Sequence, residues 1–197
     1  PFEENNRWWG KGFTEWTNVT KAVPQFEGHY QPRLPGELGF YDLRLTNVMS
    51  RQFELARQYG VDGFCFHYYW FAGKRLMEKP LEALLGDKTP EMNFPFCLCW
   101  ANENWTRRWD GAEQDVLIEQ AHTLEDHAAV FRDILRYIVD ERYIKVDGKP
   151  VIVVYRPAII TEVREMARIW RSMAEEAGLP GLYLAATNAF SFERAEE

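Results

Sequence analysis

The sequence predicts an α/β protein built on parallel strands, and in particular part of a (β/α)8 TIM barrel. Three observations lead to this fold class. Strand-like and helix-like segments alternate along the chain. The strand-like segments are short and almost continuously apolar, which is typical of parallel strands covered by helices. Aromatic and polar residues follow these strands, as they do at the C-terminal ends of barrel strands, where active sites lie.

The first half of the chain contains two helix–strand units. Asp42–Gly60 has apolar residues at helical spacing and ends in a glycine, so it predicts a helix that stops there. Val61–Trp70 follows as the first apolar strand. We expect a second helix around Leu76–Leu85 and a second strand at Phe94–Trp100, since that run is again apolar and rich in aromatic residues.

The second half continues the same alternation. Leu124–Asp140 reads as a helix, and Thr123 followed three residues later by Asp126 predicts a capping box at its start. The remaining predicted elements are a strand at Lys149–Arg156, a helix at Thr161–Gly178 and a strand at Leu182–Phe190.

Four parallel strands fit either a doubly wound sheet or a barrel, and two features favour the barrel. No glycine-rich phosphate loop follows any strand. Within the strands, small residues such as Cys65, Cys97 and Cys99 alternate with large ones, which suits a crowded barrel interior. Eight units of this length would exceed 197 residues, so we expect residues 1–197 to form a single domain that is an incomplete barrel.

Composition excludes several classes of protein. The chain is 46% hydrophobic with a net charge of −7, which argues for a packed core and against a nucleic-acid partner. No apolar run approaches the roughly 20 residues of a membrane span, and no signal peptide is visible. Cysteines within apolar strands indicate reduced, buried thiols and favour a cytoplasmic location. A metal site from Cys65, His67 and Cys99 lacks the usual close spacing, so we expect no metal.

Tryptophans are the most informative residues of this sequence. Sugar rings stack on aromatic faces, and their hydroxyl groups require fixed donors and acceptors nearby. An alternative is that some of these rings only fill the rim of the barrel. Seven tryptophans fall in predicted loops or at strand ends: Trp8, Trp9, Trp16, Trp70, Trp100, Trp105 and Trp109.

Glu103 is the first candidate for acid–base chemistry. It follows a strand and stands between Asn102 and Trp105, among aromatic residues that would partly desolvate its carboxyl group. The alternative is a structural glutamate paired with Arg107 or Arg108. Glu15, beside Trp16, is the second catalytic candidate.

The other strand ends supply candidates for substrate binding. His67 stands near the end of the first strand, where either a substrate contact or a packed, hydrogen-bonded ring is possible. Tyr68 and Tyr69 point to opposite faces, so at most one of them should reach a pocket. Arg156 could bind an anionic group or pair with a carboxylate.

Five segments make the chain resemble the WbsX-like glycosyltransferase family, which is also similar to glycoside hydrolase family 99. The resemblance implies a (β/α)8 barrel in bacterial surface-polysaccharide, O-antigen or lipopolysaccharide metabolism. It also implies a strand before the first segment and a later glutamate-rich segment that this chain lacks, so no catalytic pair is carried over. The segments are Trp8–Val19, Gly28–Arg44, Gly60–Phe71, Phe96–Gly111 and Asp147–Pro157.

The resemblance also implies a set of pocket residues and an activity. We expect a glycoside-hydrolase-like enzyme that acts on an oligosaccharide or polysaccharide without a cofactor. A glycosyltransferase and a catalytically silent glycan-binding barrel stay as alternatives, and the sequence does not predict the oligomeric state. The matching pocket positions are Trp16, His67, Tyr68, Trp70, Asn102, Glu103 and Trp105.

Overall fold

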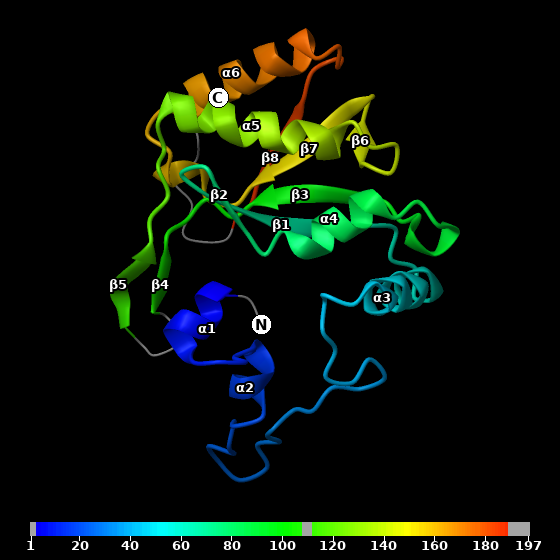
Figure 1. The fold of residues 1–197 in the computed structure, drawn as a ribbon, viewed down its shortest axis with the longest axis vertical. Coiled ribbons are helices and arrows are strands. Elements are labelled where there is room, and N and C mark those ends of the chain that lie inside the picture. The colour runs from blue at the N-terminus through cyan, green and yellow to red at the C-terminus, as the bar shows by residue number, and fades with distance from the viewer. Residues whose placement is uncertain (1–2, 108–111, 189–197) are drawn as a thin grey trace.

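The computed structural model describes residues 3–107 and 112–188 and shows a mixed α/β fold with a central sheet (Figure 1). The helices are α1 (Glu3–Trp9), α2 (Glu15–Val19), α3 (Thr46–Gln58), α4 (Lys79–Gly86), α5 (Leu124–Ile138) and α6 (Val163–Glu176). Two short 3₁₀ turns are η1 (Pro90–Met92) and η3 (Pro157–Ile159). The strands are β1 (Phe64–Phe71), β2 (Lys74–Leu76), β3 (Phe96–Trp100), β4 (Trp105–Arg107), β5 (Ala112–Ile118), β6 (Lys145–Val146), β7 (Lys149–Val154) and β8 (Tyr183–Ala186).

Strands β1, β3, β7 and β8 are mutually parallel and lie in this order in the sheet. The four predicted strands and the four predicted helices are present, with ends shifted by a few residues, so the predicted alternation is confirmed. Short antiparallel strands add to this core: β2 pairs with the end of β1, and β6 with the start of β7. The sheet formed by the described residues does not close into a complete barrel.

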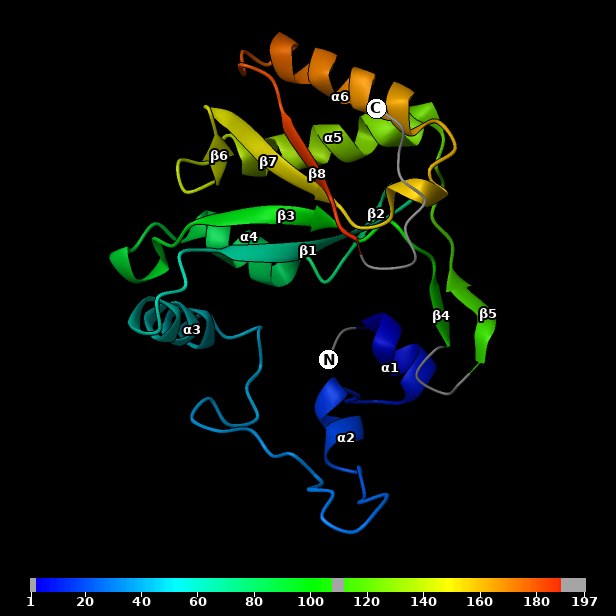
Figure 2. The ribbon, with the colours of Figure 1, turned by 180° about the vertical axis from the view of Figure 1, so that it is seen from behind.

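The parallel register divides the sheet into two faces. Cys65 lies opposite Cys97 and His67 opposite Cys99, so these side chains share one face, which we call the inner face. The alternate residues, including Phe96 and Leu98, point to the other face, where they are fully buried in the main core. Helices α5 and α6 pack together on that side, as both ribbon views show (Figures 1 and 2).

The helix boundaries follow local hydrogen bonds. The Thr123 side chain accepts a hydrogen bond from the backbone N–H of Asp126 at 3.1 Å, which is one half of the predicted capping box. The Asp126 carboxylate accepts instead from the indole N–H of Trp70. Helix α3 begins at Thr46 rather than at Asp42, because the Asp42 carboxylate accepts from the backbone N–H of Arg44 and pairs with its guanidinium. Such a side-chain turn competes with helix formation.

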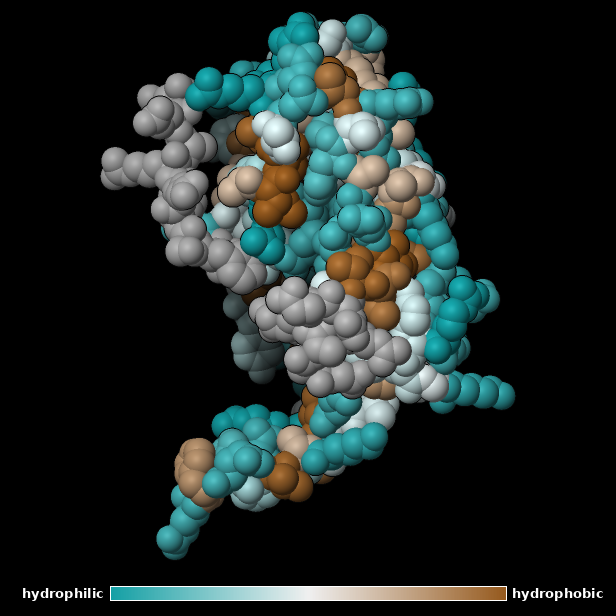
Figure 3. Space-filling model, turned by 90° about the vertical axis from the view of Figure 1, so that its left-hand side faces the viewer, coloured by the Kyte–Doolittle hydropathy of each residue, from teal (hydrophilic) through white to brown (hydrophobic). Residues whose placement is uncertain are grey.

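The segment that contains α1 and α2 and the segment that contains β4 and β5 differ from the prediction. Helices α1 and α2 replace predicted loops, because helices of five to seven residues show too little periodicity to be recognised. Strands β4 and β5 form an antiparallel hairpin where a loop was predicted. The connection between α2 and α3 extends away from the sheet and forms the lower end of the molecule (Figures 1 and 3).

The cysteines only partly match the prediction. All three are free thiols, and Cys97 and Cys99 are buried, but Cys65 is exposed. Among the described residues, the part of β1 that carries Cys65 has a strand partner on one side only, β3, because β2 pairs with β1 at Tyr69–Phe71, whereas Cys97 and Cys99 lie on β3 between β1 and β7. No group of three or more His, Cys, Asp or Glu side chains within residues 3–107 and 112–188 could hold a metal ion. In the same residues no helix is long and apolar enough to cross a membrane.

A buried ion pair fixes the N-terminal end of β3. The Arg142 guanidinium donates to both carboxylate oxygens of Asp140 at 2.9 Å and to the backbone carbonyls of Leu84, Asp87 and Met92 at 2.8–3.0 Å. Its own backbone carbonyl accepts from the N–H of Phe96. The side chain and backbone of one buried residue thus join α4, η1, β3 and the end of α5.

We expect Arg142→Met to lower the free energy of unfolding by about 3–5 kcal/mol, because three buried backbone carbonyls lose their donor and the buried Asp140 carboxylate loses one of its two cationic partners, the other being Lys88. Urea unfolding of the purified variant measures this change. Arg168→Met, which removes a solvent-exposed pair with Glu165, is the control and should leave stability unchanged. Equal stability of Arg142→Met and wild type would contradict the role given to this pair.

His127 is a second buried polar group, on the helix side of the sheet. It is fully buried, its ring lies 5.8 Å from Trp100, and neither ring nitrogen has a hydrogen-bond partner within the described part of the chain. Burial and, to a lesser degree, the charge of His122 lower the pKa of His127 to about 4. Folding therefore holds this ring in its neutral form.

Stability should consequently fall as the pH decreases. An unfolded histidine takes up a proton near pH 6.5, whereas the folded His127 does so only near pH 4. We expect the free energy of unfolding to drop by about 1 kcal/mol from this residue between pH 7.5 and 5.5. Urea unfolding across this range should show a smaller drop for His127→Leu. An identical pH dependence in both proteins would refute the assignment.

Candidate functional site

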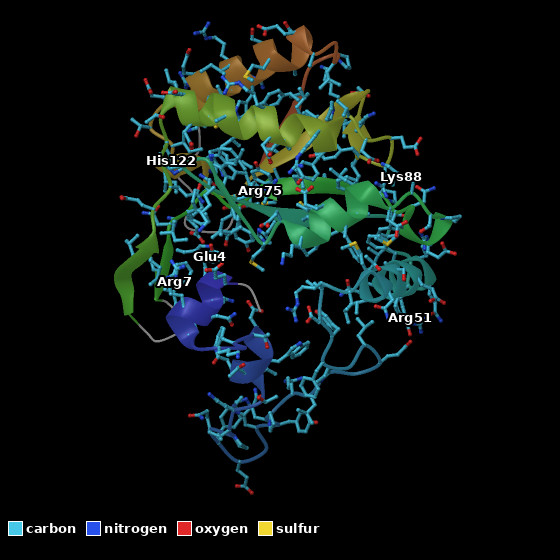
Figure 4. All side chains as sticks on the ribbon, viewed as in Figure 1. Glu4, Arg7, Arg51, Arg75, Lys88 and His122 are labelled. Carbon is cyan, nitrogen blue, oxygen red and sulfur yellow. The ribbon has the colours of Figure 1, made fainter. Side chains whose placement is uncertain are left out.

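A broad open hollow lies where the N-terminal helices face the C-terminal ends of β1 and β3. Its volume is about 1970 Å³, and α1, α2, the strand ends, β4 and the segment before α5 line it. In Figure 4, Glu4 marks the α1 side and His122 marks the point where the chain passes from β5 to α5. Glu4 pairs with Lys74 of β2 at 2.5 Å, which joins α1 to the sheet. The hollow therefore lies at the C-terminal ends of the strands, where the sequence analysis predicts the site.

The first aromatic group of the hollow is centred on Trp105. Its ring packs edge-on against Tyr69 at 5.3 Å, Phe71 at 5.5 Å and Trp8 at 6.0 Å. Trp105 is half-buried, and Trp8, Tyr69 and Trp105 line the hollow. Edge-to-face packing holds each ring in place while leaving part of a face accessible. The N-terminal helix and the first strand thus present one aromatic surface.

A second aromatic group surrounds Trp16 on α2. The Trp16 ring meets Phe40 at 5.4 Å and Tyr41 at 5.3 Å, and its indole N–H donates to the backbone carbonyl of Tyr41 at 3.2 Å. All three residues line the hollow. The hydrogen bond fixes the ring plane, so Trp16 presents a defined aromatic face beside Glu15.

Glu103 extends from the end of β3 into the same hollow. Its Oε2 accepts a hydrogen bond from Arg156 Nη1 at 3.1 Å, and the two side chains are 30% and 36% exposed, so solvent reaches both. Of the two roles left open for Arg156, the structure shows the pairing with a carboxylate. Of the alternative partners proposed for Glu103, Arg108 and the side chain of Arg107 lie outside the described part of the structure.

Glu15 is exposed at the first position of α2 and lines the hollow with Glu103. Burial, and to a lesser degree the charges of Glu15 and Glu103, raises the pKa of Tyr69 to about 12. Both catalytic candidates and Tyr69 thus line the same hollow.

Asn102 has a structural position next to Glu103. Its side-chain amide donates to the backbone carbonyl of Arg156 at 2.8 Å and accepts from the backbone N–H of Arg156 at 2.7 Å. Asn102 is fully buried, so its side chain is not open to the hollow. This reciprocal pair ties the end of β3 to the end of β7 and brings Arg156 to Glu103.

His67 lies on the inner face, deeper in the sheet than the hollow. It is exposed, and its ring contacts Tyr69 at 5.9 Å and Tyr155 at 6.0 Å. It is not one of the residues that line the hollow. His67 therefore shares the face of Tyr69 without reaching the group around Glu103.

Three of the predicted substrate-binding residues lie on the helix-covered face instead. Tyr68 and Trp100 are fully buried, and Trp70 is almost so. The Tyr68 hydroxyl donates to Asp133, and the Trp70 indole N–H donates to Asp126, both at 2.9 Å. Strand alternation explains this, because it sends Tyr69 to the hollow and its neighbours to the core. We therefore leave Tyr68, Trp70 and Trp100 out of the site, as a correction to the sequence prediction.

Sequence reasoning missed Gln120, a buried residue that follows β5. Its side chain and backbone bond to the turn that carries Glu103. The only local signal is a glutamine between a strand-like segment and a helix cap, and this signal is too weak to single it out. Trp109, another predicted site tryptophan, lies outside the described residues.

Known proteins resemble this chain in sequence and in fold. Two proteins named "Uncharacterized protein WxcX", from two strains of Xanthomonas campestris pv. campestris, are each 49% identical over 190 residues. The match covers 96% of this chain but only 27% of theirs, so the chain spans about a quarter of the length of these relatives.

A solved structure described as "Glycoside hydrolase-like protein" shares the fold. The TM-score is 0.56 with 14% sequence identity, over 78% of this chain and 46% of that one. At this identity the likeness concerns the fold alone. Residues 1–197 match the family described as "Glycosyltransferase WbsX" along their whole length, and the chain therefore belongs to the WbsX glycosyltransferase family.

Proposed function

We propose that this chain is part of a carbohydrate-active enzyme that acts on glycosidic bonds in bacterial surface-polysaccharide metabolism. The observation that carries the proposal is the Glu103–Arg156 pair, open to solvent at the ends of parallel strands and close to aromatic side chains. A charged carboxylate beside stacking surfaces is the combination that binding and cleavage of sugars require.

The four parallel strands and their helices support a (β/α)8 barrel as the complete fold, with the hollow on its active face. The proposal takes residues 1–197 as one domain that supplies part of that barrel. A cytoplasmic location also stays a prediction. The family membership and the glycoside-hydrolase-like neighbour agree with an enzyme of this kind.

The two aromatic groups favour an oligosaccharide or polysaccharide as the substrate. Trp105 and Trp16 belong to separate clusters that line the same hollow. One sugar ring needs only one stacking surface, so two surfaces suit a chain of sugars. Glu103 would accept hydrogen bonds or a proton from the substrate or water, and Glu15 is the second catalytic candidate among the carboxyl groups that line the hollow.

The family description supports a second candidate function, a glycosyltransferase. Such an enzyme would form the glycosidic bond from an activated sugar, and it would respond to a nucleotide-sugar. The third candidate is a glycan-binding barrel without turnover. It would respond to oligosaccharides, yet release no product.

We expect oligosaccharides to change the tryptophan fluorescence of the full-length protein, because Trp105 and Trp16 line the hollow. A panel containing mannose, galactose and rhamnose should identify at least one ligand. Glu103→Gln should weaken its binding by about tenfold or more, as expected for loss of a hydrogen bond to a charged group. Turnover, followed by chromatography of the products, should fall by about 10²–10⁴-fold.

Glu141→Gln is the matched control, because Glu141 is exposed and does not line the hollow. It should behave as wild type in both assays. A response to a nucleotide-sugar and to no oligosaccharide would exclude the hydrolase and favour the transferase. Binding that Glu103→Gln leaves unchanged would remove Glu103 from the site.

A further inference from the structure

Gln120 lies directly behind the turn that carries Glu103. It belongs to the segment that leads from β5 to α5, and only 7% of its surface is exposed. Its side-chain Nε2 donates to the backbone carbonyl of Ala101 at 2.6 Å and to that of Glu103 at 3.0 Å. One buried amide therefore holds the carbonyl groups on both sides of Asn102.

The backbone of Gln120 adds a third contact to the same turn. Its N–H donates to Asn104 Oδ1 at 2.8 Å. Residues 101, 103 and 104 are thus all bonded to a residue 16 to 19 positions later in the chain. On the other side, Asn102 joins this turn to Arg156.

The chemistry of the turn fixes the orientation of the Gln120 amide. Both of its hydrogen-bond partners are carbonyl oxygens, which accept hydrogen bonds and therefore require the NH₂ group of the amide as donor. Rotation of the amide by 180° would place its oxygen against two other oxygens and leave buried groups unpaired. Gln120 is therefore specified as a double donor, and neither a carboxylate nor an apolar side chain can replace it.

We propose that Gln120 is a positioning residue that sets the place of the Glu103 carboxylate relative to Arg156. This inference rests on the function proposed for Glu103. Without the two donated hydrogen bonds, the turn from Ala101 to Asn104 loses its support from one side. A displacement of the order of 1 Å at a reacting group costs about 10²-fold in rate.

Gln120→Met in the full-length protein keeps the length of the side chain but removes both donors. We expect turnover of the oligosaccharide identified above to fall by about 10–100-fold. The dissociation constant from fluorescence titration should change by less than about threefold, since the aromatic surfaces that dominate binding stay in place. Gln58→Met, at the exposed end of α3, is the matched control and should leave turnover unchanged.

A double-mutant cycle with Glu103→Gln separates positioning from a general loss of structure. If Gln120 acts through Glu103, adding Gln120→Met to Glu103→Gln should reduce the remaining turnover by less than about threefold. The same fold-reduction in both backgrounds, or full turnover in Gln120→Met alone, would overturn the inference. Full turnover in Glu103→Gln alone would instead show that the proposed role of Glu103 is wrong.

Asn104→Ala is a second variant in case Gln120→Met does not fold. Asn104 is exposed and lines the hollow, and the change removes the acceptor of the Gln120 backbone N–H together with the rest of the Asn104 amide. We expect Asn104→Ala to lower turnover by about 3–10-fold, and we expect no such loss when it is added to Glu103→Gln. Asn104→Asp keeps an acceptor oxygen, so it should restore turnover. Failure of Asn104→Asp to restore turnover, or an equal loss in both backgrounds, would also overturn the inference.

Discussion

The parallel pairing of β1, β3 and β7 is the constraint on which the rest of the structure depends. Parallel pairing places the C-terminal ends of all three strands at one edge of the sheet. The side chains that follow those strands therefore meet, although they are more than 50 residues apart in the chain, as Glu103 and Arg156 are. The same pairing leaves one face to α5 and α6 and the C-terminal edge of the sheet to the hollow. Tyr69, Glu103 and Arg156 are placed by that division, whereas Glu15 and Trp16 come from α2.

The two ends of the strands serve different purposes. At the N-terminal end of β3, Arg142 and Asp140 form a buried ion pair that satisfies three backbone carbonyls, and nothing there opens to the hollow. At the C-terminal end, the Glu103–Arg156 pair is open to solvent while the amides that hold it are buried. A buried, ion-paired N-terminal end of the strands and a solvent-accessible C-terminal end are typical of barrel enzymes, in which stability and activity occupy opposite ends of the strands.

Buried side-chain amides, rather than charged groups, connect the C-terminal ends of β3 and β7. Asn102 bonds to the backbone of Arg156, and Gln120 bonds to the backbone on both sides of Asn102. Amides can donate and accept at once, and they carry no charge whose burial would oppose folding. The carboxylate and the guanidinium are thereby left at the surface, where a substrate can reach them. The aromatic side chains around Trp105 complete this surface.

The sequence by itself determined the alternation of strands and helices, the cap at Thr123 and the family, because periodicity, capping and long motifs are properties of neighbouring residues. It also determined that Tyr68 and Tyr69 point in opposite directions. Only the tertiary structure decided that Tyr69 faces the hollow while Tyr68, Trp70 and Trp100 join the core, since a strand pattern does not say which face the helices cover. The pairing of Glu103 with Arg156 and the contacts of Gln120 were likewise decided by packing, because they join residues that are distant in the chain.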